Sequence, residues 1–460
     1  MNTKTNTKII ETKENKQNFY KSVFSLVLPL ALQNLINVSV STADVVMLGK
    51  VGETALSASS LAGQAYFVMS LIFFGLTSGA MILVAQYWGK KNIEAIEQIM
   101  GITLRVGFII AAIFTVVVLA FPGQIMRIFT NEQVVIAEGV KYLRIIACSY
   151  IIAMIPMVYT NLIRGVEQVV ISTVVYGTSL MVNIVLNAIF IFGLLGCPAM
   201  GIRGAALGTV MARVVELLIV IVYDRKFNPV LKFQPKMLFV KNKELNHDFM
   251  TYAMPVILNE LAWGCGMATV TAIVGRLGQA AVAANSVIQV GRQMAMILSF
   301  GVAGATSILV GKTIGEGKTE LARIYAKRFV KMAVILGLFG AVIILIVMPV
   351  AGSFLTLSDQ ARAYLHNMTY VMSYFCFGQS INTILIVGIF RAGGDSKVGL
   401  LIDMGTLWGF SIVMGSLAAF VFKWPVMAVY VCLVSDEIVK LPFSIKRYRS
   451  YKWLNNVTRE

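Results

Sequence analysis

The sequence predicts an all-α integral membrane protein whose twelve transmembrane helices form two similar halves. Three observations predict this class: an apolar composition, apolar runs as long as a membrane span, and an internal repeat. Of the 460 residues, 58% are hydrophobic and only 13% are charged, whereas soluble domains carry about 25% charged residues. The composition therefore excludes a soluble enzyme and a disordered or fibrous chain.

Each apolar run is bounded by charges or turn residues and reaches the roughly 20 residues that a helix needs to cross a bilayer. The runs are too long for the strands of a membrane barrel, which need about 9–11 residues. The polar start through Gln17 carries no cleavable signal pattern, so the first run is expected to be a retained span. The expected helices, in order, are 22–47, 59–86, 101–121, 143–163, 168–193, 203–223, 250–275, 281–311, 329–351, 366–391, 397–421 and 425–445.

The basic residues concentrate on one side of the membrane, and the formal net charge is +17. If the N-terminus is cytoplasmic, 29 of the 39 Lys and Arg face the cytoplasm and eight face outward, while Arg213 and Arg292 fall within spans. This positive-inside bias predicts that both termini are cytoplasmic and that the number of spans is even. No basic stripe interleaved with aromatic residues occurs, so nucleic acid is not an expected partner.

The longest and most basic connection, roughly Asp224–His247, divides the chain into two halves of six spans. The expected domains are therefore a cytoplasmic N-terminal tail, an N-terminal lobe, a basic cytoplasmic linker, a C-terminal lobe and a cytoplasmic C-terminal tail. Their expected bounds are 1–21, 22–223, 224–249, 250–445 and 446–460.

The two halves are similar when the first is shifted by 226 residues, so that Pro29, which opens the first helix, meets Pro255, which opens the seventh. Six spans return the chain to the same side, so the repeats are parallel and related by an axis near the membrane normal. Paired lobes around a central cavity suit a secondary transporter that works by alternating access. The other pairs are Gly49 and Gly275, Gly52 and Gly278, Ala55 and Ala281, Ala58 and Ala284, Gly75 and Gly301, Gly89 and Gly315, and Glu94 and Glu320.

Small residues four apart are expected to let helices approach closely in lipid. Two such pairs are Gly75 with Gly79 and Gly204 with Gly208. Arg213 and Glu216, three apart on the sixth helix, are expected to form a structural ion pair.

Motifs for catalysis or metal binding are missing from the sequence. The five Cys are scattered and the two His, His247 and His366, are far apart, which argues against zinc sites and a Ser-His-Asp triad. HExxH, GxSxG and P-loop motifs do not occur. We therefore expect no enzyme, no catalytic residues and no cofactor.

Four patches resemble the multidrug and toxic compound extrusion (MATE) family, and the resemblance covers about 20–445. The first is Ala43-Asp44 followed by Gly49-Lys-Val-Gly52, which resembles the family's Asp before a Gly-x-x-Gly turn. The others are Ser78-Gly79-Ala80 with Gln86-Tyr-Trp-Gly89, Leu162-Ile-Arg164-Gly165, and Phe390-Arg391-Ala-Gly-Gly-Asp395.

The resemblance implies a V-shaped pair of six-helix bundles in the plasma membrane, surrounded by lipid and expected to be monomeric. It implies export of organic cations or drugs, driven by inward flow of H⁺ or Na⁺. A flippase for lipid-linked substrates of the same broader fold is the alternative. Such flippases usually have fourteen spans or a strongly cationic cavity, whereas here acidic and basic residues are about equally frequent within the spans.

Asp44 is the first candidate for cation coupling, because an ionisable residue within a span is costly and marks function. The alternative is a solvated residue at the helix end. The family match implies that Asp44 is the coupling carboxylate. The family's second Asp on the fifth helix is replaced here by Asn183 and Asn187, which share one face. One carboxylate with amide oxygens suits Na⁺ as well as H⁺.

Glu260 and Asp403 are further candidates for cation coupling, and Na⁺ is expected at Asp44 or Glu260. Glu260 could instead form a structural ion pair, for which Arg292 is the expected partner, since an unpaired Arg at membrane depth is expensive. Asp403 could instead make a hydrogen bond between helices, and Asp395 is expected to be a turn or cap residue.

Polar, aromatic and methionine side chains are the candidates for the substrate cavity, because Met adapts to ligands of many shapes. In the MATE family the second and eighth helices line the cleft. The candidates are Tyr66, Met69, Tyr176, Asn259, Trp263, Arg292, Met294 and Met296.

Overall fold

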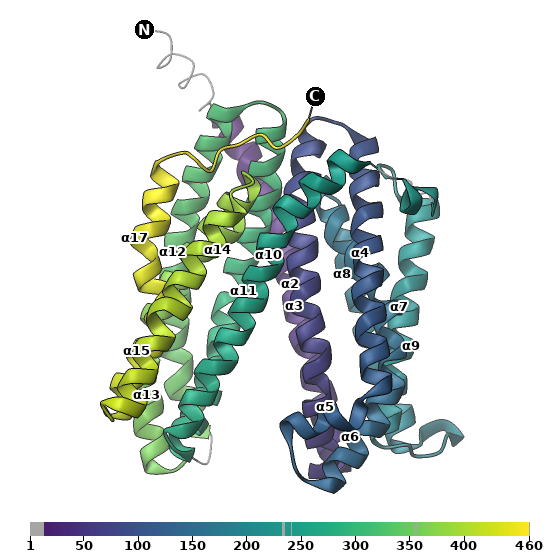
Figure 1. Ribbon diagram of the computed structural model, residues 1–460, viewed down its shortest axis with the longest axis vertical. Coiled ribbons are helices and arrows are strands. Elements are labelled where there is room, and N and C mark those ends of the chain that lie inside the picture. Colours follow the sequence, from purple (N-terminus) through teal and green to yellow (C-terminus); the bar gives the residue numbers. More distant parts are fainter. Residues whose placement is uncertain (1–12, 232–234, 241, 355–356, 460) are drawn as a thin grey trace. The chain divides into compact units, whose positions relative to one another are not determined.

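The structure is a computed structural model that describes residues 13–231, 235–240, 242–354 and 357–459 (Figure 1). Within these ranges every regular element is a helix, and no strand occurs. Eleven helices in these ranges are long and apolar enough to cross a membrane. The predicted class, an all-α multi-pass membrane protein, is confirmed.

The first half of the chain forms long helices at the predicted spans, with two short helices, α5 and α6, in the connection before α7. The helices are α2 (Lys13–Val51), α3 (Glu53–Gly89), α4 (Ile93–Ala120), α5 (Pro122–Phe129), α6 (Gln133–Ile146), α7 (Cys148–Ile163), η1 (Arg164–Val166), α8 (Val170–Phe192), η2 (Leu194–Gly196), α9 (Ile202–Val222) and η3 (Tyr223–Phe227).

The second half begins with the short helix η4 in the basic linker and contains several π-helical stretches, namely η5, η6 and η7. Its elements are η4 (Pro235–Phe239), α10 (Lys243–Arg276), α11 (Gln279–Gly315), α12 (Thr319–Phe354), α13 (Asp359–Asn382), η5 (Thr383–Phe390), α14 (Ser396–Thr406), η6 (Leu407–Ser411), α15 (Ile412–Ser416), η7 (Leu417–Val421), α16 (Val426–Leu433) and α17 (Asp436–Arg449).

The region of the predicted twelfth span is helical but broken. α16 ends at Leu433, and α17 begins at Asp436. Asp436 and Glu437 occupy the first turn of α17, where the helix dipole favours acidic side chains, whereas they would be unfavourable within one continuous apolar helix. The break therefore follows from these two acidic residues.

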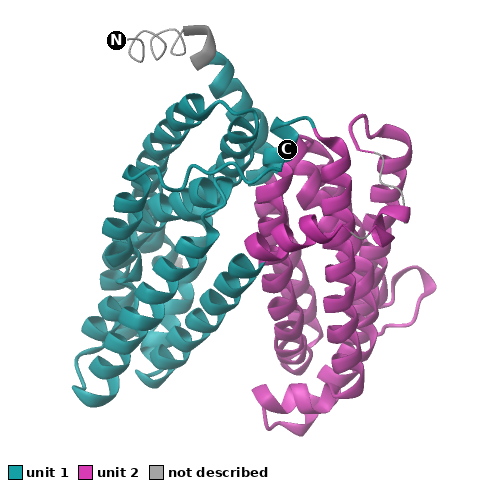
Figure 2. Cartoon of the chain, turned by 45° about the horizontal axis from the view of Figure 1, so that its top comes forward, with its two compact units in different colours: residues 1–31, 85–91, 254–460 teal, residues 32–84, 92–253 magenta. Residues whose placement is uncertain are grey.

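The chain divides into two compact units (Figure 2). Unit 1 consists of Met1–Ala31, Ala85–Lys91 and Met254–Glu460, and unit 2 of Leu32–Val84 and Asn92–Ala253. Helices α2, α3 and α10 pass from one unit into the other. Unit 2 is built mainly from α4, α7, α8 and α9, and unit 1 from α11, α12, α13 and η5.

Glycines let helix backbones meet within unit 2, as the spacing of small residues predicts. A Cβ on Gly204 of α9 would lie 2.5 Å from the backbone of Phe190 on α8. A Cβ on Gly79 would lie 2.4 Å from the Cα of Ala253. A larger residue at either position would have to push the helices apart.

The end of α3 is bound into unit 1 by the segment Trp453–Arg459, which we name the C-terminal strap. Buried Gln86 donates from Nε2 to the carbonyl oxygens of Ala392 and Asn455, at 2.7 and 3.1 Å, and its Oε1 accepts from the Val457 N–H at 2.8 Å. A Cβ on Gly315 of α11 would lie 1.8 Å from the Gln86 carbonyl oxygen. The strap, α3 and α11 thus pack against one another at this end of unit 1.

Candidate functional site

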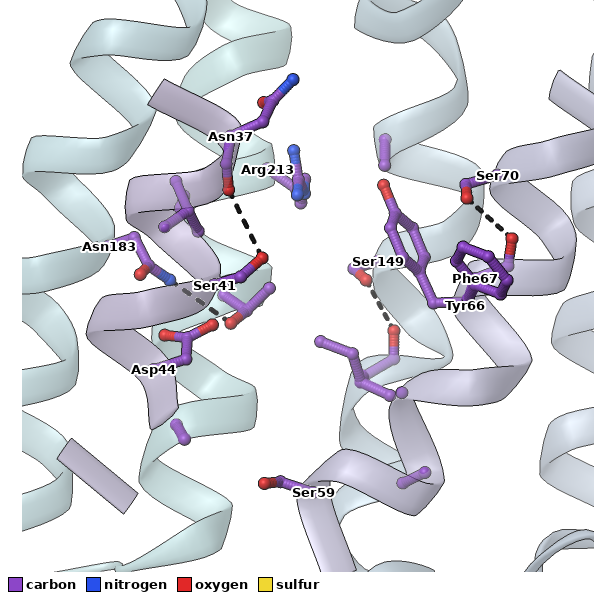
Figure 3. A pocket seen from close by; sticks show the side chains of 18 of the residues that line it. Asn37, Ser41, Asp44, Ser59, Tyr66, Phe67, Ser70, Ser149, Asn183 and Arg213 are labelled. Atoms are coloured by element: carbon purple, nitrogen blue, oxygen red, sulfur yellow. Dashed lines mark hydrogen bonds between the residues drawn. The ribbon is translucent and has the colours of Figure 1, made fainter. Parts of the chain in front are cut away.

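Unit 2 contains a pocket of about 680 Å³ lined by residues of α2, α3, α6, α7, α8 and α9 (Figure 3). In Figure 3, Asn37, Ser41 and Asp44 lie along α2 on one side, and Tyr66 lies on α3 on the opposite side. Two predicted cavity residues, Tyr66 and Tyr176, line this pocket, as do Asp44 and Asn183. The volume suits a drug-sized ligand.

Asp44 is held by the two asparagines of α8 that the sequence singles out. Asn187 Nδ2 donates to Asp44 Oδ1 at 2.6 Å and to Asn183 Oδ1 at 3.2 Å. Asn183 Nδ2 donates in turn to Thr209 Oγ1 at 3.3 Å. Asn183 and Asn187 are buried, so this series of hydrogen bonds fixes one oxygen of the Asp44 carboxylate, and Asp44 lines the pocket.

An ion pair forms another part of the pocket wall. Arg213 Nη1 donates to both carboxylate oxygens of Glu216, at 2.7 and 2.9 Å, which confirms the predicted pair. The guanidinium lies 5.9 Å from the centre of the Tyr66 ring, an arrangement in which a cation is attracted to the ring. With Arg213 and Glu216 balanced, Asp44 gives the pocket its negative charge, and Tyr142 and Tyr150 add aromatic surface.

Gly208 of α9 makes room for the amide that holds Asp44. A Cβ at this position would lie 2.2 Å from Asn187 Oδ1. We expect Gly208→Ala to displace the amide and to destabilise the fold by about 1–3 kcal/mol through overpacking. The matched control is Gly177→Ala on α8, where the added methyl meets only Ile36 at 3.8 Å. The unfolding temperatures of both variants check this; equal temperatures would show that the Asn187 amide tolerates the added methyl group.

In unit 1, Glu260 forms a buried ion pair with Arg391, at 2.6 Å between Oε1 and Nη2. The predicted pair with Arg292 is therefore wrong. Arg292 donates to Gln289 Oε1 at 2.7 Å and to Gln379 Oε1 at 3.3 Å instead. Arg391 directly follows η5, at the end of a predicted span. Its side chain is buried, and its guanidinium contacts the Glu260 carboxylate.

Asp403 lies beside Asn259 and a buried lysine. Asn259 Nδ2 donates to Asp403 Oδ2 at 3.0 Å, and Lys440 Nζ of α17 lies 2.7 Å from Asp403 Oδ1. Two predicted residues of different helices, Asn259 and Asp403, thus meet in unit 1. The carboxylate is paired with both an amide and an ammonium group.

A family model described as MatE matches this chain twice, over residues 29–189 and 255–417. The chain belongs to the MATE family. The two matches begin at Pro29 and Pro255, the first pair of the predicted repeat, and they confirm that repeat. MATE proteins are membrane transporters rather than enzymes, and they need no cofactor.

Relatives of similar length cover nearly all of this MATE chain. The "Probable multidrug resistance protein YoeA" of Bacillus subtilis (strain 168) is 25% identical, over 97% of this chain and 96% of its own. The "Uncharacterized transporter YisQ" of the same strain is 22% identical over 94% and 95%. The "Probable multidrug resistance protein NorM" of Thermotoga maritima is 23% identical over 96% and 94%.

Solved MATE structures share the fold. A crystal structure of MATE in the bent conformation is 18% identical and matches with a TM-score of 0.85, over 94% of this chain and 96% of that chain. A MOP superfamily transporter from Pyrococcus furiosus, described as having a binding pocket of reversed polarity, is also 18% identical and matches with a TM-score of 0.84 over the same shares.

The remaining predicted cavity residues of this MATE protein have different surroundings. Met69 and Met296 are buried, whereas Met294 is exposed, and Trp263 is partly buried against the core of unit 1. These four residues do not line the pocket of unit 2. Their predicted role as cavity residues stays a prediction.

Asp395 stands at the N-cap position of α14, as predicted for a cap residue, but its side chain makes no capping bond. Its carboxylate accepts instead from Arg447 Nε and Nη2, at 2.6 and 2.9 Å. These hydrogen bonds raise the pKa of Arg447.

Four charged residues of unit 1 have a role in the structure that their sequence pattern does not predict: Arg391, Asp436, Glu437 and Lys440. All four are buried. The spacing of Lys440 from Asp436 (i,i+4) and from Glu437 (i,i+3) is typical of ion pairs on a helix surface. This pattern predicts pairing but does not predict burial. Lys440 is followed by Pro442 and by several more basic residues, a pattern that is typical of the solvated end of a last span.

Proposed function

We propose that this protein is a multidrug exporter that couples the efflux of organic cations or drugs to the inward movement of H⁺ or Na⁺. The observation that carries the proposal is the position of Asp44. Its carboxylate gives a drug-sized, tyrosine-lined pocket its negative charge and is held by Asn187. An aromatic pocket with one negative charge suits an organic cation.

The names of relatives support the drug as substrate, since YoeA and NorM are both described as probable multidrug resistance proteins. In the proposed cycle, alternating access exposes Asp44 first to one side of the membrane and then to the other. Drug and coupling ion compete for, or are coupled through, the same carboxylate. Each shifts the equilibrium only by its difference in affinity for the two states.

A direct test identifies the coupling ion. The full protein is reconstituted into proteoliposomes, and a proton gradient or a sodium gradient is imposed separately while uptake of a fluorescent organic cation is measured. We expect one of the two gradients to drive transport and Asp44→Asn to remove that drive. Transport of the dye driven by neither gradient would contradict ion coupling, and flipping of labelled lipid instead would favour the flippase alternative.

We further propose a monomer in the plasma membrane with lobes at 22–223 and 250–445, joined by a cytoplasmic linker at 224–249. The excess of Lys and Arg on one side supports this orientation. A reporter inserted between Asp224 and His247 is therefore expected to be protected from externally added reagents in intact cells. A reporter placed near Lys141 is the control and should be accessible. Labelling of the linker from outside would overturn the topology.

A further inference from the structure

The basic residues around the start of α12 in unit 1 differ in how their charges are compensated. Lys318, just before the helix, forms an ion pair with Glu316 at 2.7 Å, and Arg323 forms one with Glu320 at 2.6 Å. Glu320 is the last acidic residue of α12, which continues to Phe354. Basic residues beyond Arg323 therefore have no carboxylate on their own helix with which to pair.

Three further cations follow on α12, namely Lys327, Arg328 and Lys331, which we name the α12 basic patch. Lys331 is four residues from Lys327 and three from Arg328, so all three side chains lie on neighbouring parts of one side of the helix. Both lysines are exposed, and neither has an ion-pair partner within the described part of the chain. Two like charges four residues apart repel each other and destabilise a helix, unless an anion lies between them.

Arg328 is positioned by an aromatic ring but lacks an acceptor. Its guanidinium carbon lies 5.1 Å from the centre of the Phe19 ring on α2, which also packs against Tyr325 and Phe329 at 4.7 and 5.2 Å between ring centres. The ring attracts the cation but offers no oxygen. Arg328 Nη1 is buried and has no hydrogen-bond acceptor among the described residues. A buried donor of this kind requires an acceptor.

The surface of α12 next to the patch is apolar and exposed. The helix has 36 residues and is therefore about 54 Å long, more than the roughly 40–45 Å of a whole bilayer. The predicted span, 329–351, begins directly after Arg328, which places the patch at the depth of the lipid headgroups. On the same side of the helix, at intervals of one turn after the patch, Ile335, Leu338 and Val342 are between 50% and 64% exposed.

This combination of charge and apolar surface indicates the class of ligand. A phosphate group offers oxygen acceptors that match the planar guanidinium of arginine, and it adds the negative charge that the two lysines lack. The adjacent apolar stripe suits acyl chains, which a free phosphate would leave unused. A zwitterionic lipid carries its own ammonium group, so a patch of cations favours a lipid with a net negative charge.

We propose that the α12 basic patch binds the headgroup phosphate of an anionic phospholipid. Arg328 donates to the phosphate oxygens from a guanidinium that Phe19 already holds in place, and Lys327 and Lys331 add positive charge. The acyl chains cover the exposed apolar residues of the following turns. Phe19 and the patch both belong to unit 1 (Figure 2), so the site is separate from the pocket of unit 2, and its occupation does not depend on drug export.

Lipid binding by the purified full-length protein tests the proposal. Native mass spectrometry counts the phosphatidylglycerol or phosphatidylcholine molecules retained during a titration, and the rise in unfolding temperature with each lipid is measured in parallel. Each charge near a membrane surface contributes about 1 kcal/mol, or roughly a fivefold change in affinity. Arg328→Gln should therefore weaken phosphatidylglycerol binding about fivefold, and Lys327→Gln with Lys331→Gln about 25-fold. Arg328→Lys, which keeps the charge but loses the planar fork, should lie between Arg328→Gln and the parent protein.

The matched control is Arg362→Gln, which makes the same chemical change at an exposed position of α13, beyond the other end of α12. It should bind phosphatidylglycerol like the parent protein. The two lysines are exposed, so their variants should fold and keep the test decisive even where Arg328→Gln does not fold. Equal phosphatidylglycerol binding by the parent and the patch variants, or equal binding of phosphatidylcholine by the parent, would overturn the proposal. Stabilisation by inorganic phosphate as large as that by the lipid would overturn the assignment to a phospholipid.

Discussion

Asp44→Asn is expected to abolish gradient-driven drug efflux while leaving a folded, inserted protein that still binds drug. Asn is nearly isosteric with Asp and can keep one hydrogen bond with Asn187, so packing should change little. The carboxylate, however, provides most of the difference in affinity for H⁺ or Na⁺ between the two facing states, and without that difference the ion cannot drive the cycle. Asp44→Glu should keep part of the activity, since the charge survives at a shifted position.

Dye efflux from energised cells at matched expression measures this effect. Asp359→Asn is a suitable control, since it makes the same chemical change at an exposed position. Drug binding to the purified variants separates coupling from recognition. If Asp44→Asn cells export dye at the wild-type rate, the coupling ion binds elsewhere, and Glu260 or Asp403 becomes the leading candidate.

Arg391→Gln should destabilise the folded protein more than any of the other substitutions proposed above. It leaves Glu260 as a buried carboxylate without its guanidinium, and breaking a buried ion pair in this way costs about 3–5 kcal/mol. Glu260→Gln should also destabilise, because it leaves Arg391 without that acceptor. The double variant Glu260→Gln with Arg391→Gln should recover part of the loss, since neither charge is left unpaired.

The three variants are compared as a double-mutant cycle, with thermal unfolding and the protein level in membranes as the measurements. The matched control cycle combines Glu260→Gln with Arg292→Gln, because Arg292 binds Gln289 and Gln379 rather than Glu260. We expect coupling in the first cycle and additive effects in the second. Additive losses for Glu260 and Arg391 would show that the pair does not contribute to stability.

The fold is largely predictable from the sequence, because the length of each apolar run and the turn residues at its ends are local features that set where a helix begins and ends. The predicted helix over 203–223, for example, corresponds to α9 (Ile202–Val222), which begins just after Gly201 and the turn before it. The paired prolines Pro29 and Pro255 likewise mark the start of both matches to the family model. The break before α17 is less predictable, because the sequence does not say whether Asp436 and Glu437 lie within one continuous helix or begin a new one.

Partners across the fold are harder to predict than the residues themselves. Asp44, Asn183 and Asn187 are recognisable as unusual polar residues within spans, and the structure brings them together. Glu260 is equally unusual, yet its partner Arg391 lies 131 residues away at the end of a span, where a basic residue is ordinarily solvated. Spacing along one helix cannot tell which of several distant cations will reach a carboxylate, because tertiary packing decides it.

The C-terminal strap sets an order for the assembly of the molecule during synthesis. Gln86 is translated 371 residues before Val457, the residue whose N–H it accepts. At about 5–20 residues per second, the buried amide waits roughly 20–75 s for this partner. Most of unit 2 comes from one stretch ending at Ala253, so it can fold while the rest of the chain is still being made. Unit 1 is completed late, and until the strap has been made the Gln86 side chain lacks its hydrogen bonds with Asn455 and Val457.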